Sequence, residues 1–145
     1  MKISKALDNF KKSPNNSLSI FLFHGIISKS ENEKSVHALV ATLRPNCRNL
    51  LIIGIGGSSL GLKAIQNALL DPNSNLLPLD QRNGPRLFVL DNIDPAMTTS
   101  TLDIVKKDDP HLQHTVVCVI SKSGETVEIA ANLMVALREL STATF

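Results

Sequence analysis

The sequence predicts an α/β fold in which helices flank a doubly wound, flavodoxin-like parallel sheet. Three short apolar runs lack the alternation of a half-exposed strand, which is typical of strands buried on both faces. A segment with helical spacing follows each run, so that strand and helix alternate three times. A length of 145 residues suffices for one domain with a hydrophobic core.

The expected strands and helices alternate through the last two thirds of the chain. They are strands at 50–55, 87–90 and 115–120 and helices at about 60–70, 95–107 and 126–140. Asp94 and Pro95 form a good helix start, because Asp caps free amides and Pro is tolerated at the first helical position. Asp109-Pro110 then ends that helix, and the turn-rich residues 71–85 are expected to form a long surface connection.

The last expected helix is apolar over a broad face, which suits a helix packed on a sheet. One apolar stripe consists of Val127, Ala130, Met134 and Leu137, and another of Ile129, Leu133, Ala136 and Leu140. Glu128, Asn132 and Glu139 are then expected to face water.

Residues 1–48 carry no chemical motif and are expected to form an N-terminal helical or extended segment. A short helix is expected near residues 3–11 and another near residues 33–43, with an apolar run at 18–27 between them. The inward side chains of the second helix are expected to be Val36, Leu39, Val40 and Leu43.

Composition excludes several classes of function. The net charge of +2, without a basic stripe, does not suggest nucleic-acid binding, and five Phe without Trp or Tyr offer no stacking platform for single strands. The apolar run at 18–27 resembles a signal-peptide core, but Asp8, His24 and the missing small-residue cleavage site argue against secretion. It is also too short to span a bilayer. Cys47 and Cys118 lack metal-ligand spacing, so a reducing cytoplasm is the simplest compartment.

The first of two polar loops follows the first expected strand and reads LIIGIGGSSLG over residues 51–61. Such a glycine-rich turn lets backbone amides and a helix N-terminus approach an anion. The dinucleotide fingerprint needs a glycine where Ser59 stands. The phosphate loop of nucleotide hydrolases fails too, because Leu62 precedes Lys63 and Ala64 stands where Ser or Thr should bind magnesium. A nucleotide triphosphate is therefore not expected.

The second loop, SKSGET at residues 121–126, follows the third expected strand. Its hydroxyls and amides suit the oxygens of a phosphate monoester better than a metal or a base. With the strands ordered 2-1-3, the two loops would flank the crevice at the switch point of the sheet, where α/β proteins bind ligands. Either loop alone is explained equally well by purely structural turns and caps.

Other polar residues are weaker candidates. The four histidines, His24, His37, His111 and His114, lack partners at metal-ligand spacing, so surface or capping roles are expected and no metal or other cofactor is implied. No G-x-S-x-G nucleophile motif is present, and Asp108-Asp109 is expected to be a solvated turn rather than an acid/base pair.

Three ordered segments, IGIGGSSLG at 53–61, FVLDNIDP at 88–95 and SKSGETVE at 121–128, resemble the glucose-6-phosphate isomerase family. The resemblance covers roughly residues 49–140 and implies that residues 49–145 are the N-terminal part of a sugar-isomerase (SIS) domain in a longer protein. It also implies roles for seven residues. The residues that would bind the phosphate are Ser121, Lys122, Ser123, Gly124 and Thr126. Gly57 and Ser58 would contact the phosphate end and the sugar.

The activity implied by the resemblance is the reversible aldose–ketose isomerisation of glucose 6-phosphate and fructose 6-phosphate in glycolysis and gluconeogenesis. A base must move a proton between C2 and C1. Glu125 and Glu128 lie at the phosphate end, and the family's arginine, glutamate base, histidine and late lysine fall beyond Phe145. We therefore expect this chain to bind a sugar phosphate but to be inactive alone. By analogy, the family implies a homodimer. Composition and the short apolar run suggest neither nucleic acid nor a membrane as a partner.

Two alternatives stay open at this point. SKSGET also resembles the wider set of SIS modules, so the chain could be a non-catalytic phosphosugar-binding module. It could also be a fragment that only packs or oligomerises, with loops that are purely structural.

Overall fold

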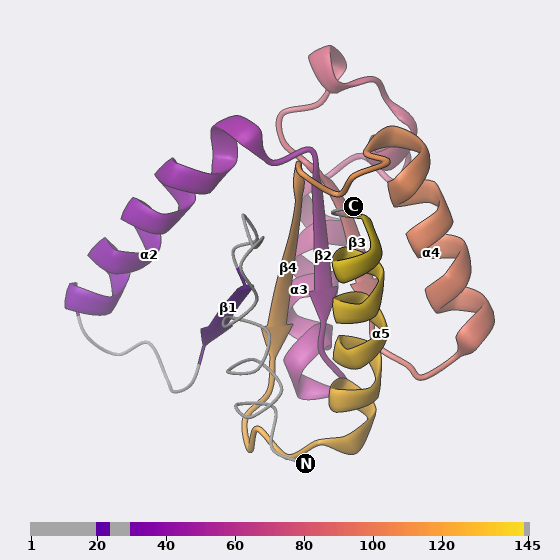
Figure 1. Cartoon of the computed structure of the whole chain (residues 1–145). Helices are drawn as coiled ribbons and strands as arrows, with labels where there is room; N and C mark the ends of the chain where they lie inside the picture. The colour runs from indigo at the N-terminus through magenta and orange to yellow at the C-terminus, as the bar shows by residue number, and fades with distance from the viewer. Residues whose placement is uncertain (1–19, 24–29, 144–145) are drawn as a thin grey trace.

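The computed structural model describes the backbone of residues 20–23 and 30–143 and the side chains of residues 34–143 (Figure 1). The helix expected near residues 3–11 lies outside the described residues. The elements, in chain order, are β1 (Ile20–Phe23), α2 (Ser30–Leu43), η1 (Arg44–Asn46), β2 (Asn49–Ile53), α3 (Gly57–Leu69), η2 (Ser74–Leu76), η3 (Leu79–Gln81), β3 (Arg86–Leu90), α4 (Pro95–Asp108), β4 (Thr115–Ile120) and α5 (Val127–Ala143).

The described strands form one parallel sheet in the order β1-β4-β2-β3. The three expected strands are β2, β3 and β4, and β2 lies between the other two. The predicted 2-1-3 order, and with it the doubly wound α/β fold, is therefore confirmed.

Strand β1 was not expected. It comes from the apolar run before residue 48 and pairs with β4, with Ile20 opposite Val117 and Phe23 opposite Ile120. The sheet thus contains one strand from the first 48 residues. That strand covers the edge of β4, which would otherwise present unpaired amides and carbonyls. The division of the chain at residue 48 stays a prediction.

Helices α4 and α5 cover one face of the sheet and enclose its core (Figure 1). Alternate residues of the strands point into this core, as the burial pattern of β4 shows. The buried cluster consists of Leu51, Ile53, Leu90, Leu102, Val105, Leu112, Val117, Val119, Ile129, Leu133, Ala136 and Leu140. Asp94 caps α4 as expected, accepting a hydrogen bond from the Ala96 amide at 2.9 Å.

Helix α5 departs from the expected pattern at four residues. Val127 and Met134 are 76% and 51% exposed, so only one of the two expected stripes is fully buried. Asn132, expected to face water, is buried. Its side-chain amide donates to the carbonyl of Asn92 at 2.8 Å, which satisfies a loop carbonyl beneath the helix. Glu139 is also drawn inward, because it pairs with Lys106 of α4.

The opposite face of the sheet carries α3, which lies behind the strands in Figure 1. Helix α2 lies beside this face and does not pack tightly on it. A largely apolar cavity of about 380 Å³ separates Leu39 and Leu43 from the sheet residues Ile52 and Cys118. The expectation that Val40 faces inward is wrong, because Val40 is 48% exposed.

Candidate functional site

Two polar loops leave neighbouring strands at the same edge of the sheet. Strands β2 and β4 are parallel, and Ile53 is opposite Val119 in their register. The chain leaves β2 at Gly54 and β4 at Ser121, so the two loops begin within one residue pair of each other. Helix α3 then covers one face and α5 the other (Figure 1). The expected switch-point arrangement is therefore present.

The first loop turns tightly into α3, which begins at Gly57, three residues earlier than expected. Gly56 has φ 57°, a left-handed conformation that glycine adopts without strain. The Ser58 amide donates to the carbonyl of Ile55 at 3.1 Å and the Ser59 amide to that of Gly56 at 3.0 Å. Gly57 is exposed and Ser58 is half-buried, so both residues expected to contact the sugar phosphate lie at the surface of this turn.

Gly54 permits a close approach within the same loop. A β-carbon at Gly54 would lie 2.9 Å from the carbonyl oxygen of Ser58. The side chain of Ser59 is buried, and its hydroxyl donates to the carbonyl of Gly56 at 3.1 Å. Glycine at 54 and a small hydroxyl at 59 therefore shape the turn from within.

The second loop is held by its own hydroxyls. Ser121 is buried, and its Oγ accepts a hydrogen bond from the Gly124 amide at 3.0 Å. The Oγ of Ser123 accepts one from the Glu125 amide at 3.2 Å. Gly124 has φ 69°, which favours glycine. The Gly124 amide is thus engaged within the loop, while Lys122 and Ser123 are exposed.

Helix α5 begins directly after this loop, at Val127. The Ala130 amide donates to the carbonyl of Thr126 at 3.0 Å, so Thr126 stands at the start of the helical hydrogen-bond pattern. The first amides of a helix have no carbonyl partner within it, and they carry the positive end of the helix dipole. A phosphate beside residues 121–126 would meet both hydroxyls and this partial charge.

Two interactions near this edge were missed by the sequence reasoning. Lys63 of α3 forms an ion pair with Asp91 at 2.6 Å, joining the helix after the first loop to the turn after β3. Asn132 of α5 fixes the same turn through the carbonyl of Asn92. The one available signal was an Asn in an otherwise apolar stretch of α5, because a buried amide needs a partner.

The other sequence candidates have structural roles. His111 and His114 contact the carbonyls of Ala143 and Asn46, and the described residues contain no group of three or more potential metal ligands. Burial raises the pKa of the Cys47 and Cys118 thiols, which makes both poor nucleophiles.

The expectation of a solvated turn at Asp108-Asp109 is wrong for Asp109. This residue is buried, and its carboxylate accepts hydrogen bonds from the Gln113 amide, the His114 amide and the Thr115 hydroxyl at 3.1, 2.7 and 2.8 Å. Asp109 therefore fixes the start of β4, because three donors converge on one carboxylate.

Three cavities of about 360 to 450 Å³ are lined by described residues, and none of these three includes a residue of the two loops. Across the part of the chain that the structure describes, no helix has both the length and the apolar character needed to cross a membrane.

Comparison with known proteins agrees with this arrangement. A family model described as phosphoglucose isomerase matches residues 35–144. A probable glucose-6-phosphate isomerase of Methanococcus maripaludis is 43% identical over 90 residues, which cover 62% of this chain and 18% of that protein. The glucose-6-phosphate isomerase of Rubrobacter xylanophilus is 43% identical over 83 residues, covering 57% of this chain and 18% of that protein.

A third relative extends further along the chain. The glucose-6-phosphate isomerase of Carboxydothermus hydrogenoformans is 33% identical over 113 residues, which cover 78% of this chain and 23% of that protein. The chain thus spans about a fifth of the length of the curated relatives it matches. Since the family model covers most of the 145 residues, this chain belongs to the phosphoglucose isomerase family.

Proposed function

We propose that this chain is the N-terminal portion of a glucose-6-phosphate isomerase and supplies the residues that bind the phosphate of the sugar. The whole protein would interconvert glucose 6-phosphate and fructose 6-phosphate in the cytoplasm, in glycolysis and gluconeogenesis. The proposal rests on one observation above all: adjacent parallel strands β2 and β4 direct two loops rich in amides and hydroxyls to one edge of the sheet. Residues 49–145 would form the N-terminal part of its SIS domain.

The proposed phosphate contacts come from residues 121–126. Ser123 and Thr126 would donate hydroxyl hydrogens, and the amides around Lys122 would donate from the backbone. Ser121 would hold the loop through the Gly124 amide and can still donate its own hydroxyl hydrogen. Gly57 and Ser58 would meet the phosphate end and the sugar. Each hydrogen bond to a charged group contributes about 1.5 to 3 kcal/mol, so a few suffice for binding a metabolite.

This portion would bind the substrate without transferring the proton. Glu125 and Glu128 are exposed in the first turn of α5 or just before it. A carboxylate there favours the helix dipole and lies at the phosphate end, whereas the base must reach C1 and C2. The base and the group that stabilises the enediolate would come from elsewhere in the whole protein.

The test is a titration of the 145-residue chain with fructose 6-phosphate, followed by amide NMR shifts. We expect saturable shifts at residues 121–127 and at 57–58, and at least a tenfold loss of affinity in Ser123→Ala with Thr126→Ala. The matched control is Ser141→Ala with Thr142→Ala. It removes the same two hydroxyls from the exposed far end of α5, where they donate to helix carbonyls. This control should bind like the parent chain.

Three outcomes decide the matter. Absence of saturable shifts in the parent chain would leave the loops purely structural. Isomerase turnover by the chain alone would contradict the absence of a base. Binding by the chain, without turnover by the longest polypeptide that the native gene encodes around it, would favour a non-catalytic phosphosugar-binding module.

A further inference from the structure

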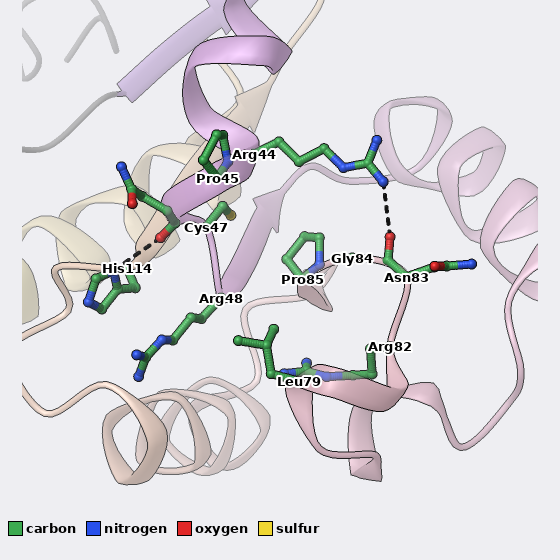
Figure 2. A pocket seen from close by; sticks show the side chains of 11 residues that line it. Arg44, Pro45, Cys47, Arg48, Leu79, Arg82, Asn83, Gly84, Pro85 and His114 are labelled. Carbon is green, nitrogen blue, oxygen red and sulfur yellow. Dashed lines mark hydrogen bonds between the residues drawn. The ribbon is translucent and has the colours of Figure 1, made fainter.

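A group of cationic side chains lies at the opposite edge of the sheet, where β2, β3 and β4 begin. A cavity of about 450 Å³ opens there between η1 and the segment that precedes β3. Its eleven lining residues include Arg44, Arg48, Arg82 and His114 and no acidic side chain (Figure 2). In Figure 2 the Arg44 side chain passes on one side of Pro85, and those of Arg48 and Arg82 lie on the other.

The cavity has a rigid frame, because hydrogen bonds join the segments that form it. The Arg48 amide donates to the carbonyl of His114 and the Arg86 amide to that of Arg48, both at 2.8 Å. The Arg44 guanidinium donates to the carbonyl of Asn83 at 3.2 Å. The starts of three strands are therefore held in place. Charges attached to such a frame need little reorganisation when a ligand binds.

The charges around the cavity are not balanced. The nearest acidic residues along the lining segments are Asp80, on the exposed turn η3, Asp108, whose carboxylate lies 3.4 Å from Arg86, and Asp109. The Asp109 carboxylate is buried and accepts hydrogen bonds from the Gln113 and His114 amides and the Thr115 hydroxyl, so it pairs with none of the three lining arginines. Two Arg82 nitrogens, Nε and Nη1, are buried and have no hydrogen-bond partner among the described residues. Burial lowers the pKa of the Arg82 guanidinium, and repulsion from Arg86 lowers it further by a smaller amount. Attraction to Asp108 raises this pKa, but by less than the other two causes lower it.

We propose that this cavity binds a small anion that carries at least two negative groups, such as a diphosphate or a dicarboxylate. Guanidinium groups match phosphate and carboxylate oxygens with paired hydrogen bonds, and a second negative group would use a second arginine. The site is separate from the 121–126 loop. The five residues of β2 lie between the two edges, which is about 17 Å at the rise of a parallel strand.

The experiment is an amide NMR titration of the 145-residue chain with pyrophosphate and, in a separate arm, with malonate. Sodium chloride holds the ionic strength constant, because salt screens exposed charges. We expect saturable shifts at residues 44–48, 82–85 and 114. The arm with the tighter binding identifies phosphate or carboxylate as the preferred group.

Two variants sharpen the test. Arg48→Gln changes an exposed side chain at the mouth of the cavity and should weaken binding about tenfold without affecting folding. Arg82→Gln should weaken binding at least as much, but its burial makes a folding check by circular dichroism necessary. Lys34→Gln with Arg138→Gln removes two exposed charges outside the cavity and should leave binding unchanged.

The proposal fails if neither anion produces saturable shifts at residues 44–48 and 82–85. It also fails if Arg48→Gln and the control variant bind alike, because net charge alone would then explain the binding. Shifts confined to residues 121–127 would place pyrophosphate at the other edge, which contradicts this proposal and leaves the proposed sugar-phosphate site untouched.

Discussion

The two proposed anion sites, at opposite edges of the sheet, differ in their hydrogen-bond donors. The carboxyl edge is where β2 and β4 end and the loops at residues 54–58 and 121–126 begin. The donors there are hydroxyls and backbone amides, and the only cation in the second loop is Lys122. The amino edge is where β2, β3 and β4 begin, beside the arginine-lined cavity. The donors there are guanidinium groups, and two nitrogens of Arg82 are buried without a partner among the described residues. Removing a neutral donor from water costs less than removing a cation, and an anionic ligand can offset the desolvation cost of a buried cation. The carboxyl edge would therefore recognise a ligand mainly by the placement of its oxygens, and the amino edge mainly by its negative charge.

The edges also differ in what holds them together. The two loops at the carboxyl edge are shaped by glycine geometry and by short hydroxyl contacts within each loop, such as Ser121 to Gly124. Two longer-range contacts, Lys63 to Asp91 and Asn132 to Asn92, involve the turn after β3 at the same edge. The amino edge depends on contacts between segments far apart in sequence, such as Arg48 to His114. Local contacts can be disturbed one loop at a time. At the amino edge three donors converge on one buried carboxylate, that of Asp109, so this edge should be the more sensitive to a single substitution.

The largest effect is expected from Asp109→Ala. Three donors at the start of β4, from Gln113, His114 and Thr115, would lose their acceptor in a buried place. Unsatisfied buried groups cost about 1 to 3 kcal/mol each, so the free energy of unfolding should fall by about 3 kcal/mol or more. Urea denaturation measures this change.

The control for that substitution is Asp103→Ala on the exposed side of α4, which should change stability by less than about 0.5 kcal/mol. Where Asp109→Ala still folds, NMR shifts should change at the amino edge and remain unchanged at residues 121–126. A loss below about 1 kcal/mol, or equal disturbance at both edges, would contradict the role assigned to Asp109.

An intermediate effect is expected from Gly54→Ala at the carboxyl edge. The new β-carbon would lie 2.9 Å from the Ser58 carbonyl oxygen, which is backbone and cannot rotate away. Overpacking of this kind costs about 1 to 3 kcal/mol, and the shifted turn should weaken the fructose 6-phosphate response at residues 57–58. Thermal unfolding and the NMR titration measure the two effects.

Gly61→Ala is the matched control, because a β-carbon there meets nothing within 4 Å and the residue lies inside α3. It should stabilise the chain by about 0.5 to 1 kcal/mol, since alanine is the better helix former. If Gly54→Ala were as stable as Gly61→Ala, the close approach within the first loop would have no energetic consequence.

The sequence predicted the strands and the polar loops because both follow from local patterns. Local patterns do not fix the strand order, and the 2-1-3 order is preferred because it brings the two loops together. The three apolar runs mark β2, β3 and β4. Burial on both faces holds for most of β2, whereas residues of β4 alternate between buried and half-buried. The cap at Asp94 marks a helix start, and the glycines at 56 and 124 mark turns, by their own chemistry. The roles of Ser121, Ser123 and Thr126 in phosphate binding stay a prediction, because no ligand contact has been measured.

Several features that the sequence did not predict depend on partners distant along the chain. Asn132 is buried because a carbonyl 40 residues earlier lies beneath it, and periodicity alone assigned it to water. Strand β1 belongs to the sheet through pairing with β4, almost a hundred residues later. The arginines of the amino edge are scattered in sequence, and parallel strand pairing brings them together.

The smallest effect is expected from Glu139→Gln. Glu139 lies between α4 and α5, where it pairs with Lys106, and belongs to neither edge. Hydrogen bonds from Lys106 and Arg138 hold the pKa of the Glu139 carboxyl below its usual value of 4.5. A lowered folded-state pKa adds stability that is fully present above pH 4.5 and is lost as the pH falls through the folded-state pKa. The free energies of unfolding of parent and variant should therefore differ by about 1 kcal/mol or less at pH 7, and the difference should vanish in stronger acid. Urea denaturation across that pH range measures it.

The titrations with fructose 6-phosphate and with pyrophosphate should both stay unchanged in Glu139→Gln, because α4 and α5 would stay packed through the apolar core. A loss of binding at either edge would show that this helix pair also positions the loops.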